Sequence, residues 1–375
     1  MLSVWEKESF YAPCDVIIAG SGFVGLWSAY YLKKKQPDLR ITIIDRGSIP
    51  TSASTRNAGF ACFGSVTELM KDVHSMGEDD MLSLVEMRFK GLERIRKAFG
   101  KKIEYSTCGG YEIIPDVQHE RYSELKEQVS WLNRQLSRLL KTKKTFRFSD
   151  NDIKRFGFAG VSHIIANDLE GYLHPGKLCQ SLIQKISSKG VNILPATEIK
   201  SFEDSADGIT IQTSTGISLR ANQLLVCTNA FAQQLLPQLD VVPARGQVLV
   251  TAPIPSLKIK GTFHYDEGYY YFRNLGKRLL LGGARNLAIE QETTTELQTT
   301  QLIQQTLEAF IARHLLPDTP IEITDRWSGI MAMGAEKMPI VKKLSAHTYC
   351  AVKMSGMGVA LAPVAADVVS DLMLD

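Results

Sequence analysis

Short apolar runs flank a helical stretch over residues 14–45, near the start of the chain. Asp15–Ala19 is the first run, and Ile41–Ile44 is the second. Runs of this length without polar alternation are typical of parallel strands buried on both faces. The helical pattern between them extends from about Val24 to Lys35. These residues therefore predict a strand–helix–strand unit.

Residues 81–141 carry apolar positions at helical spacing and predict two amphipathic helices. The segment Gly109–Ile114 lies between the two stripes and predicts a strand. We interpret both stripes as core packing. The first consists of Leu84, Met87, Leu92, Ile95 and Phe99, and the second of Leu125, Val129, Leu132, Leu136 and Leu139.

Residues 171–230 return to a mixture of helix and strand. A turn is followed by a predicted helix with Leu178 and Leu182 on its apolar face, and Val191–Leu194 predicts a strand. Gln223–Cys227 is a further apolar run that predicts a buried strand returning to the first sheet. Between these strands, Ile199–Phe202 and Ile209–Thr213 alternate as antiparallel strands do.

The last third of the chain predicts a second sheet and a final return to the first. Residues 241–285 are rich in strand patterns, and a mostly polar helix is expected over about Thr295–His314. Thr348–Met354 predicts a strand, Ser355–Gly358 a turn and Val359–Met373 a closing helix.

These elements predict an α/β protein with a discontinuous Rossmann-like nucleotide-binding domain. The second domain is expected to be an α+β substrate domain with a mixed or antiparallel sheet. The predicted boundaries are 12–80, 150–235 and 325–375 for the first domain, and 81–149 and 236–324 for the second.

The composition favours an ordinary soluble globular protein: 375 residues, 44% apolar, 22% charged and a net charge of +3. So small a charge argues against nucleic acid or an anionic membrane as the main partner. No apolar stretch reaches the roughly 18–20 residues that span a bilayer, and the first residues lack a signal-peptide pattern. The six cysteines are scattered without metal-ligand spacing. We therefore expect a reduced, cytoplasmic protein without a metal site.

The strongest motif is the glycine-rich turn at residues 20–25. Gly20 allows the tight turn, Gly22 lets a pyrophosphate approach the backbone, and Gly25 lets helix and strand pack closely. The free N–H groups of the helix N-terminus suit phosphates. Asp45 stands at the end of the next strand, 20 residues after the last glycine, where it can accept hydrogen bonds from a ribose. The motif predicts dinucleotide binding.

The small-residue stretch Gly47–Ser65 follows the acid and is too long for a simple turn. Its backbone N–H groups and the side chains of Ser54, Thr55 and Asn57 could contact phosphates or a ring. The alternative is a solvated loop without a binding role.

Taken together, these motifs resemble the D-amino-acid oxidase, glycine oxidase and sarcosine oxidase superfamily of FAD-dependent amine oxidoreductases. The resemblance covers nearly the whole chain and implies FAD rather than NAD, with the turn at 355–358 facing the flavin pyrimidine ring. The order of the landmarks carries it: GSGFVG at 20–25, STRNAGF at 54–60, GYLHPGKL at 171–178, VCTNAF at 226–231, PARGQ at 243–247, LLLGG at 279–283, WSGIMAM at 327–333 and SGMGVALAP at 355–363.

Several departures from the family pattern bear on the substrate. The arginine that clamps a substrate carboxylate soon after a WSG-like stretch is missing here. Ile330 stands near the place of the cysteine that links flavin covalently in sarcosine-oxidase-like members, so we expect non-covalent FAD. Leu280 takes the position of a lysine that helps oxygen react, and Ala360 that of a carboxylate-binding lysine. The chain looks closer to the gamma-glutamylputrescine oxidase-like branch.

The candidate FAD contacts come from the motif and from the resemblance. Arg56 and Asn57 are singled out near the flavin. The full set is Gly20, Gly22, Phe23, Val24, Gly25, Asp45, Arg46, Ser54, Thr55, Arg56, Asn57, Ala58, Gly59, Ile199, Thr228, Asn229, Gly329, Gly356, Met357, Gly358 and Val359.

The candidates for substrate positioning are Arg245, Gln247, Tyr270, Arg273 and Met333. Strand alternation puts Arg245 and Gln247 on one face, where Arg245 either faces the substrate or forms a structural ion pair. Arg273 either replaces the missing clamp or stacks and pairs at a domain seam. Alternation also separates Tyr270 from its tyrosine neighbours, so at most one of the two sets lines a pocket.

Two further residues invite a chemical role. His174 could be a base, although a turn histidine before proline is the plainer interpretation. Cys62 could be reactive, although a buried thiol is the default.

The leading hypothesis is an enzyme that oxidises the C–N bond of an amine or amino acid to an imine, by hydride transfer to flavin N5. Oxygen or another acceptor would then re-oxidise the flavin. One alternative is a dehydrogenase of the same fold that passes electrons to a quinone or carrier protein. Another is an FAD-bound regulatory or assembly protein without turnover. The sequence leaves the substrate and the oligomeric state open.

Overall fold

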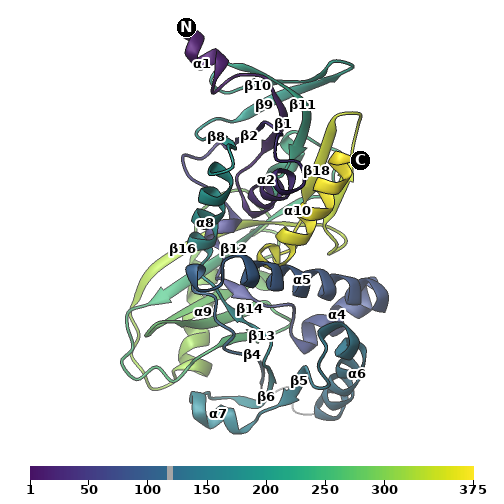
Figure 1. Cartoon of the computed structure of the whole chain (residues 1–375). Helices are drawn as coiled ribbons and strands as arrows, with labels where there is room; N and C mark the ends of the chain where they lie inside the picture. Colours follow the sequence, from purple (N-terminus) through teal and green to yellow (C-terminus); the bar gives the residue numbers. More distant parts are fainter. Residues whose placement is uncertain (116–120) are drawn as a thin grey trace.

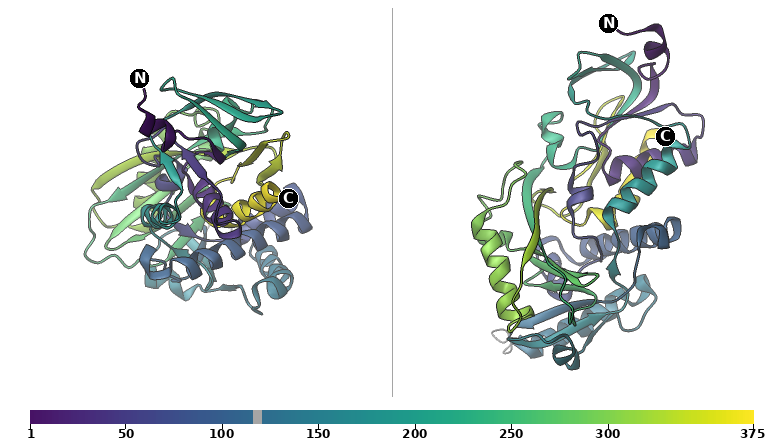
Figure 2. Two further views of the ribbon diagram at one scale, coloured as in Figure 1. Left: turned by 45° about the horizontal axis from the view of Figure 1, so that its top comes forward. Right: turned by 90° about the vertical axis from the view of Figure 1, so that its left-hand side faces the viewer.

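The computed structural model describes residues 1–115 and 121–375. Two eight-stranded sheets organise the chain, one above the other in Figure 1. The two views in Figure 2 show the same division, with the N-terminus and the C-terminal helix on the side of the first sheet. No helix among the described residues is long and apolar enough to cross a membrane.

The first sheet has the strand order β17-β18-β11-β1-β2-β8, and the hairpin β9–β10 extends it from β11. Four neighbouring pairs in its centre are parallel, and Ile18 pairs with both Ile43 and Leu225. The pairing of β11 with β1, and of β18 with β11, confirms the predicted discontinuous nucleotide sheet. The bounds are β1 Cys14–Ala19, β2 Ile41–Ile44, β8 Asn192–Leu194, β9 Ile199–Ser205, β10 Gly208–Thr213, β11 Ser218–Val226, β17 Ile340–Lys343 and β18 Thr348–Val352.

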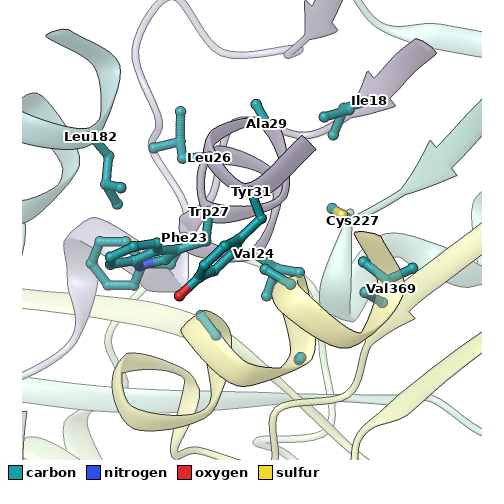
Figure 3. Close-up of a cluster of buried hydrophobic side chains, with 14 of the residues drawn as sticks. Ile18, Phe23, Val24, Leu26, Trp27, Ala29, Tyr31, Leu182, Cys227 and Val369 are labelled. Carbon is teal, nitrogen blue, oxygen red and sulfur yellow. The ribbon is translucent and has the colours of Figure 1, made fainter. Parts of the chain in front are cut away.

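Three helices cover one face of this sheet: α2 (Phe23–Lys35), α8 (Pro175–Ser187) and α10 (Gly358–Leu374). Figure 3 shows the core between them, where Trp27 and Tyr31 of α2 lie in the same cluster as Leu182 of α8 and Val369 of α10. Helix α2 is buried nearly all round, which explains why its apolar pattern is not one-sided.

The second sheet has the order β16-β12-β15-β14-β13-β4-β6-β5, and all its pairs are antiparallel except β13–β4. This mixed sheet agrees with the predicted fold class. The bounds are β4 Gly110–Pro115, β5 Phe146–Phe148, β6 Val161–Asn167, β12 Val242–Thr251, β13 Thr262–Tyr265, β14 Tyr270–Leu275, β15 Arg278–Gly283 and β16 Ile323–Met333.

Two strands pair differently from the predicted domain boundaries: β6 lies wholly inside the segment 150–235, and β16 spans the boundary at residue 325. We assigned 150–235 and 325–375 to the nucleotide domain, but β6 and β16 pair within the second sheet. The boundaries rest on patterns along the chain, and such patterns do not reveal which strands pair. The division into domains itself stays a prediction.

The remaining helices pack around the second sheet and between the two sheets. The amphipathic stripes predicted over 81–141 form α5 and α6, while residues 116–120 of that region lie outside the described part. The polar helix expected over 295–314 begins later, as α9, and ends in a short π-helical turn. The bounds are α1 Val4–Glu8, α3 Ala53–Arg56, α4 Val66–Met76, α5 Glu78–Ala98, α6 Tyr122–Leu140, α7 Asn151–Phe156 and α9 Gln301–Phe310, with a small two-stranded sheet of β3 Phe60–Ala61 and β7 Gly171–Tyr172.

Candidate active site

A cavity of about 410 Å³ lies between the two sheets. Its volume is in the range of small-molecule and cofactor sites. We call the lining from the first sheet, its loops and the N-termini of α2 and α10 the nucleotide wall. We call the lining from β12–β16, α4 and the segment 60–62 the second-sheet wall.

The glycine turn at the start of α2 shapes the nucleotide wall as the motif predicts. Gly20 has a φ of +104°, and a Cβ at Gly25 would lie 2.0 Å from the carbonyl oxygen of Gly20. Gly22 is the N-cap of α2, which has no side-chain cap. The first amide of the helix, that of Phe23, instead donates to Ser54 Oγ at 2.9 Å. The N-terminus of α2 therefore faces the cavity with little side-chain cover.

Asp45 holds the turn as well as lining the cavity. Its Oδ2 accepts hydrogen bonds from the amide and hydroxyl of Ser21 at 2.7 and 2.6 Å. Its Oδ1 accepts from the Gly47 amide at 2.8 Å. These bonds orient the carboxylate, and Arg46 beside it stacks on the ring of Phe231 at 3.7 Å.

The loop after Asp45 contains one helical turn, α3. The Asn57 amide donates to the carbonyls of Ala53 and Ser54, and its Oδ1 accepts from the Gly59 amide. Arg56 donates to the carbonyl of Ser328 at 3.0 Å. Asn57 therefore holds the loop in shape, while Arg56 ties it to β16.

Two buried hydroxyls on the nucleotide wall have no hydrogen-bond partner among the described residues: Thr228 Oγ1 and Ser355 Oγ. Buried polar atoms normally have partners, so a polar ligand would satisfy them. Helix α10 begins beside Ser355 and, like α2, has no side-chain cap. Asn229 accepts bonds from the amides of Lys353 and Met354, which fixes the end of β18.

Most of the predicted cofactor residues line the cavity. Gly25, Thr55 and Gly59 do not; Gly25 and Gly59 make close backbone approaches, and Thr55 donates to the Pro50 carbonyl. The predicted residues in the lining are Gly20, Gly22, Phe23, Val24, Asp45, Arg46, Ser54, Arg56, Asn57, Ala58, Ile199, Thr228, Asn229, Gly329, Gly356, Met357, Gly358 and Val359. That they contact a cofactor stays a prediction.

Tyr271 dominates the second-sheet wall. Its ring lies directly over Gly282 of β15, where an added Cβ would come within 2.5 Å of the ring. Gly246 of β12 lies beneath it, and a Cβ there would lie 3.6 Å from the Tyr271 hydroxyl and 3.2 Å from Met331. Burial raises the pKa of Tyr271 to about 12. The two glycines thus make room for a tyrosine that keeps its proton.

The prediction that Arg245 and Gln247 position substrate needs correction. The pleat turns their neighbours Gly246 and Val248 toward the cavity and turns both polar side chains away. Arg245 is 2% exposed and forms a two-bond ion pair with Glu292 at 2.8 and 2.9 Å, and Gln247 donates to the same carboxylate. Burial alone would raise the pKa of Glu292, but the hydrogen bonds from Arg245 and Gln247 lower it overall. The structural ion pair, our alternative, is what the structure contains.

Arg273 and Tyr270 also lie away from the cavity. Arg273 donates to the carbonyls of Ala58 and Asn274 and stacks over Tyr172, while burial lowers its pKa to about 10. Tyr270 packs into the core of the second sheet, on the face opposite to Tyr271. Arg273 therefore stacks and bonds within the protein, as in our alternative for it, and Tyr271 rather than Tyr270 lines the cavity.

The two remaining candidates, Met333 and His174, differ in whether they line the cavity. Met333 lines the cavity. His174 is the N-cap of α8, where its Nδ1 accepts from the Lys177 amide at 3.2 Å, so it serves the turn rather than the cavity.

The sequence reasoning overlooked Arg285, which follows β15 and lines the cavity. No ion pair is found for its guanidinium within the described ranges, 1–115 and 121–375. Arg285 lines the same cavity as Tyr271, and its charge lowers the pKa of the Tyr271 hydroxyl against the larger effect of burial. The sequence feature that could have drawn attention to Arg285 is the Gly-Gly-Ala turn before it, in which Gly283 and Ala284 both have positive φ.

Cys62 and His264 also line the cavity, and both are buried. Burial raises the pKa of the Cys62 thiol to about 11. Glu170, behind them, brings a carboxylate oxygen within 3.5 Å of His264 Nε2. The turn role that we preferred for His174 agrees with its place at the N-cap of α8, and His264 is the histidine found in the lining among the described residues.

Comparison with known proteins gives a consistent result. The family model described as FAD dependent oxidoreductase matches residues 15–372. The bifunctional protein ThiO/ThiG of Synechocystis is 24% identical over 373 residues, covering 96% of this chain but only 52% of that protein, so the chain spans about half its length. Gamma-glutamylputrescine oxidoreductase of Escherichia coli is 24% identical over 378 residues, covering 96% of this chain and 83% of that one.

Solved structures agree at the level of the fold. Glycine oxidase from Geobacillus kaustophilus matches with a TM-score of 0.78 at 19% identity, covering 96% of this chain and 95% of the other.

The nucleotide wall fits FAD on its own geometry. Two uncapped helix N-termini suit phosphate and a ring carrying negative charge, Asp45 suits ribose hydroxyls, and Thr228 and Ser355 offer unpartnered hydroxyls. Ile330, where the resemblance pointed to a flavin-linking cysteine, lies in the lining with no reactive side chain.

Proposed function

The chain belongs to the FAD-dependent oxidoreductase family, and from that premise we propose that it oxidises the C–N bond of an amine or amino acid to an imine. It is an enzyme, and its cofactor is FAD, held without a covalent link. Bound FAD supplies the acceptor for the hydride that leaves the substrate carbon. The imine is then hydrolysed by water to a carbonyl compound and the released amine.

The observation that carries this proposal is that Arg285 and Tyr271 both line the cavity on the second-sheet wall. A guanidinium without an ion pair among the described residues suits a carboxylate, and a protonated tyrosine hydroxyl can donate a hydrogen bond to the same ligand. The sulfur-bearing side chains of Met331 and Met333 add an apolar surface that excludes water. A substrate amine bearing an acidic group would be oriented by these contacts, with no protein base required if the amine enters neutral.

Related proteins support this substrate class through their names. Gamma-glutamylputrescine oxidoreductase and glycine oxidase both designate nitrogen-bearing substrates. The WSG-like stretch at residues 327–329 is not followed by the arginine that would bind a substrate carboxylate. We propose that Arg285, from another part of the chain, positions the substrate carboxylate instead.

The test is the visible absorbance of the FAD-loaded protein, kept anaerobic, before and after a panel of amines and amino acids is added. Loss of the flavin bands with one compound supports the proposal and identifies a substrate. Retention of the bands with every compound in a broad panel, on fully loaded protein, would instead favour an FAD-binding regulatory or assembly role.

A second candidate is a dehydrogenase that passes electrons to a quinone or carrier protein. Leu280, at the place of the oxygen-linked lysine, is 3% exposed and packs with Ala58 and Val248, so no cation stands there. Re-oxidation of the bleached protein separates the two: rapid return of the flavin bands with peroxide formation in air indicates an oxidase. Slow return in air that a quinone accelerates indicates the dehydrogenase.

A further inference from the structure

Cys62, Glu170 and His264 form a buried cluster beside the cavity. The thiol sulfur, one carboxylate oxygen and one imidazole nitrogen all lie within 4.8 Å of one another. The three residues come from separate parts of the chain: the segment after β3, the turn before β7, and β13. Cys62 and His264 line the cavity, so the cluster is open to it on one side. We call this set the Cys62 cluster.

The carboxylate of Glu170 is held in place by only one of its oxygens. Oε1 accepts hydrogen bonds from the amides of Phe63 and Gly64, at 2.8 and 3.2 Å. Oε2 points to His264, and Gly110 leaves space for it, because a Cβ there would lie 2.3 Å from this oxygen. Anchoring of one oxygen while the other stays available is what an outer shell does for a metal-binding carboxylate.

His264 presents an unpartnered nitrogen to the cluster. The residue is 5% exposed, and its Nε2 has no hydrogen-bond partner in the described part of the chain. The nearest acid, Glu170 Oε2, is 3.5 Å away, which is too long for a hydrogen bond. The ring of Phe60 meets the imidazole edge-on at 5.4 Å and limits its rotation.

We propose that the Cys62 cluster is a binding site for a divalent transition-metal ion of the zinc type. Thiolate, imidazole and carboxylate are the three ligand types that Zn²⁺ takes in proteins. Metal–ligand bonds of about 2.0–2.3 Å in a tetrahedral arrangement put the ligand atoms about 3.3–3.8 Å apart. This spacing suits the ligand atoms of the Cys62 cluster, where Glu170 and His264 lie too far apart for a direct hydrogen bond. The fourth position faces the cavity, the arrangement of zinc sites that keep one position open.

The surroundings favour a cation. Glu68 and Glu112 are buried and act electrostatically on His264, in addition to Glu170. The nearby cations are Arg88 and Lys337: Arg88 pairs with Asp72 at 3.8 Å and with Glu68 at 3.9 Å, and Lys337 pairs with Asp72. These two cations pair with Asp72 and Glu68 and with neither Glu170 nor Glu112, so a divalent ion would offset the charge of the Glu170 carboxylate. The proposal revises the prediction of no metal site and is independent of the proposed function.

The test is titration of the FAD-loaded protein, without a polyhistidine tag, with Co²⁺ and then Zn²⁺. We expect one Co²⁺ per chain, with tetrahedral absorption bands at wavelengths beyond those of the flavin and a thiolate charge-transfer band. Excess Zn²⁺ should displace these bands. Cys62→Ser should abolish the charge-transfer band, and His264→Gln should weaken Co²⁺ binding by at least about tenfold.

Cys108→Ser is the matched control, because Cys108 is half-buried and outside the cluster. Its Co²⁺ spectrum should equal that of the unchanged protein. Should Cys62→Ser lose FAD or unfold, Glu170→Gln replaces it, with the flavin spectrum as the check of folding. Absence of tetrahedral Co²⁺ bands, or bands that survive both Cys62→Ser and His264→Gln, would overturn the proposal.

Discussion

The two walls of the cavity are built in different ways. The nucleotide wall is centred on the motif at residues 20–25, whose glycines and helix N-terminus act through backbone atoms. The second-sheet wall is formed by single side chains from separate strands, such as Tyr271 of β14 and Met331 of β16. A wall made of backbone atoms tolerates few substitutions, whereas a wall of side chains can change its specificity while the fold persists.

This difference yields an expectation for mutations. Changes behind or within the backbone-built parts should cost stability or cofactor, and changes of cavity-facing side chains should alter substrate use. Four substitutions test it, beginning with the largest effect.

Arg245→Met should destabilise the protein by about 3–5 kcal/mol, because it leaves the buried carboxylate of Glu292 without its partner. Urea unfolding of the FAD-loaded protein measures this loss. The KM for substrate should change little, since Arg245 faces away from the cavity. Replacing both partners, Arg245→Met with Glu292→Leu, should restore part of the stability. A raised KM at unchanged stability would contradict this and indicate that Arg245 contacts the substrate.

Gly25→Ala should cost about 1–3 kcal/mol and most of the bound FAD, because the new Cβ would lie 2.0 Å from a backbone oxygen that cannot move aside cheaply. Thermal unfolding and the ratio of flavin to protein absorbance give both numbers. Gly176→Ala is the control: only the ring of His174 lies within 4 Å of its added Cβ. Full FAD content in Gly25→Ala would contradict the role of this close approach.

Arg285→Met should raise the KM of substrates with a carboxylate by about tenfold, equal to about 1.4 kcal/mol, without loss of FAD. Amines that lack an acidic group should be affected less. Arg278→Met is the matched control. This arginine lies at the start of β15, the strand that precedes Arg285, where it is partly exposed and pairs with Asp325. If Arg285→Met raised the KM equally for both substrate classes, Arg285 would not bind the substrate carboxylate.

Tyr271→Phe should slow anaerobic flavin reduction by about threefold to tenfold, the effect of losing one hydrogen bond worth about 0.5–1.5 kcal/mol. Because the pKa of Tyr271 is raised to about 12, its hydroxyl remains protonated up to about pH 10. The alkaline part of the pH profile should therefore be the same in both proteins. Tyr270→Phe, on the opposite face, should leave the rate unchanged. An alkaline limb that disappears in Tyr271→Phe would show that Tyr271 ionises in this range.

The success of the sequence predictions follows the same division between the walls. The βαβ unit, the glycine turn and the return of Gln223–Cys227 to the first sheet rest on local patterns, and the structure contains them all. The family resemblance is confirmed by the match over residues 15–372. Strand alternation correctly separated Arg245 from Gly246, but no local pattern states which face of a buried strand meets a cavity.

The sequence by itself determined the family, the cofactor and the arrangement of the nucleotide sheet, because these depend on residues close together in the chain and on backbone geometry. Only the tertiary structure decided which polar side chains face the cavity. Arg245 found its charge partner in Glu292, 47 residues further along the chain, whereas Arg285 found none in the described part of the molecule. The Cys62 cluster likewise required three distant segments to meet. Such contacts between distant segments determine which charges pair and which side chains are buried. Local spacing along the chain does not predict them.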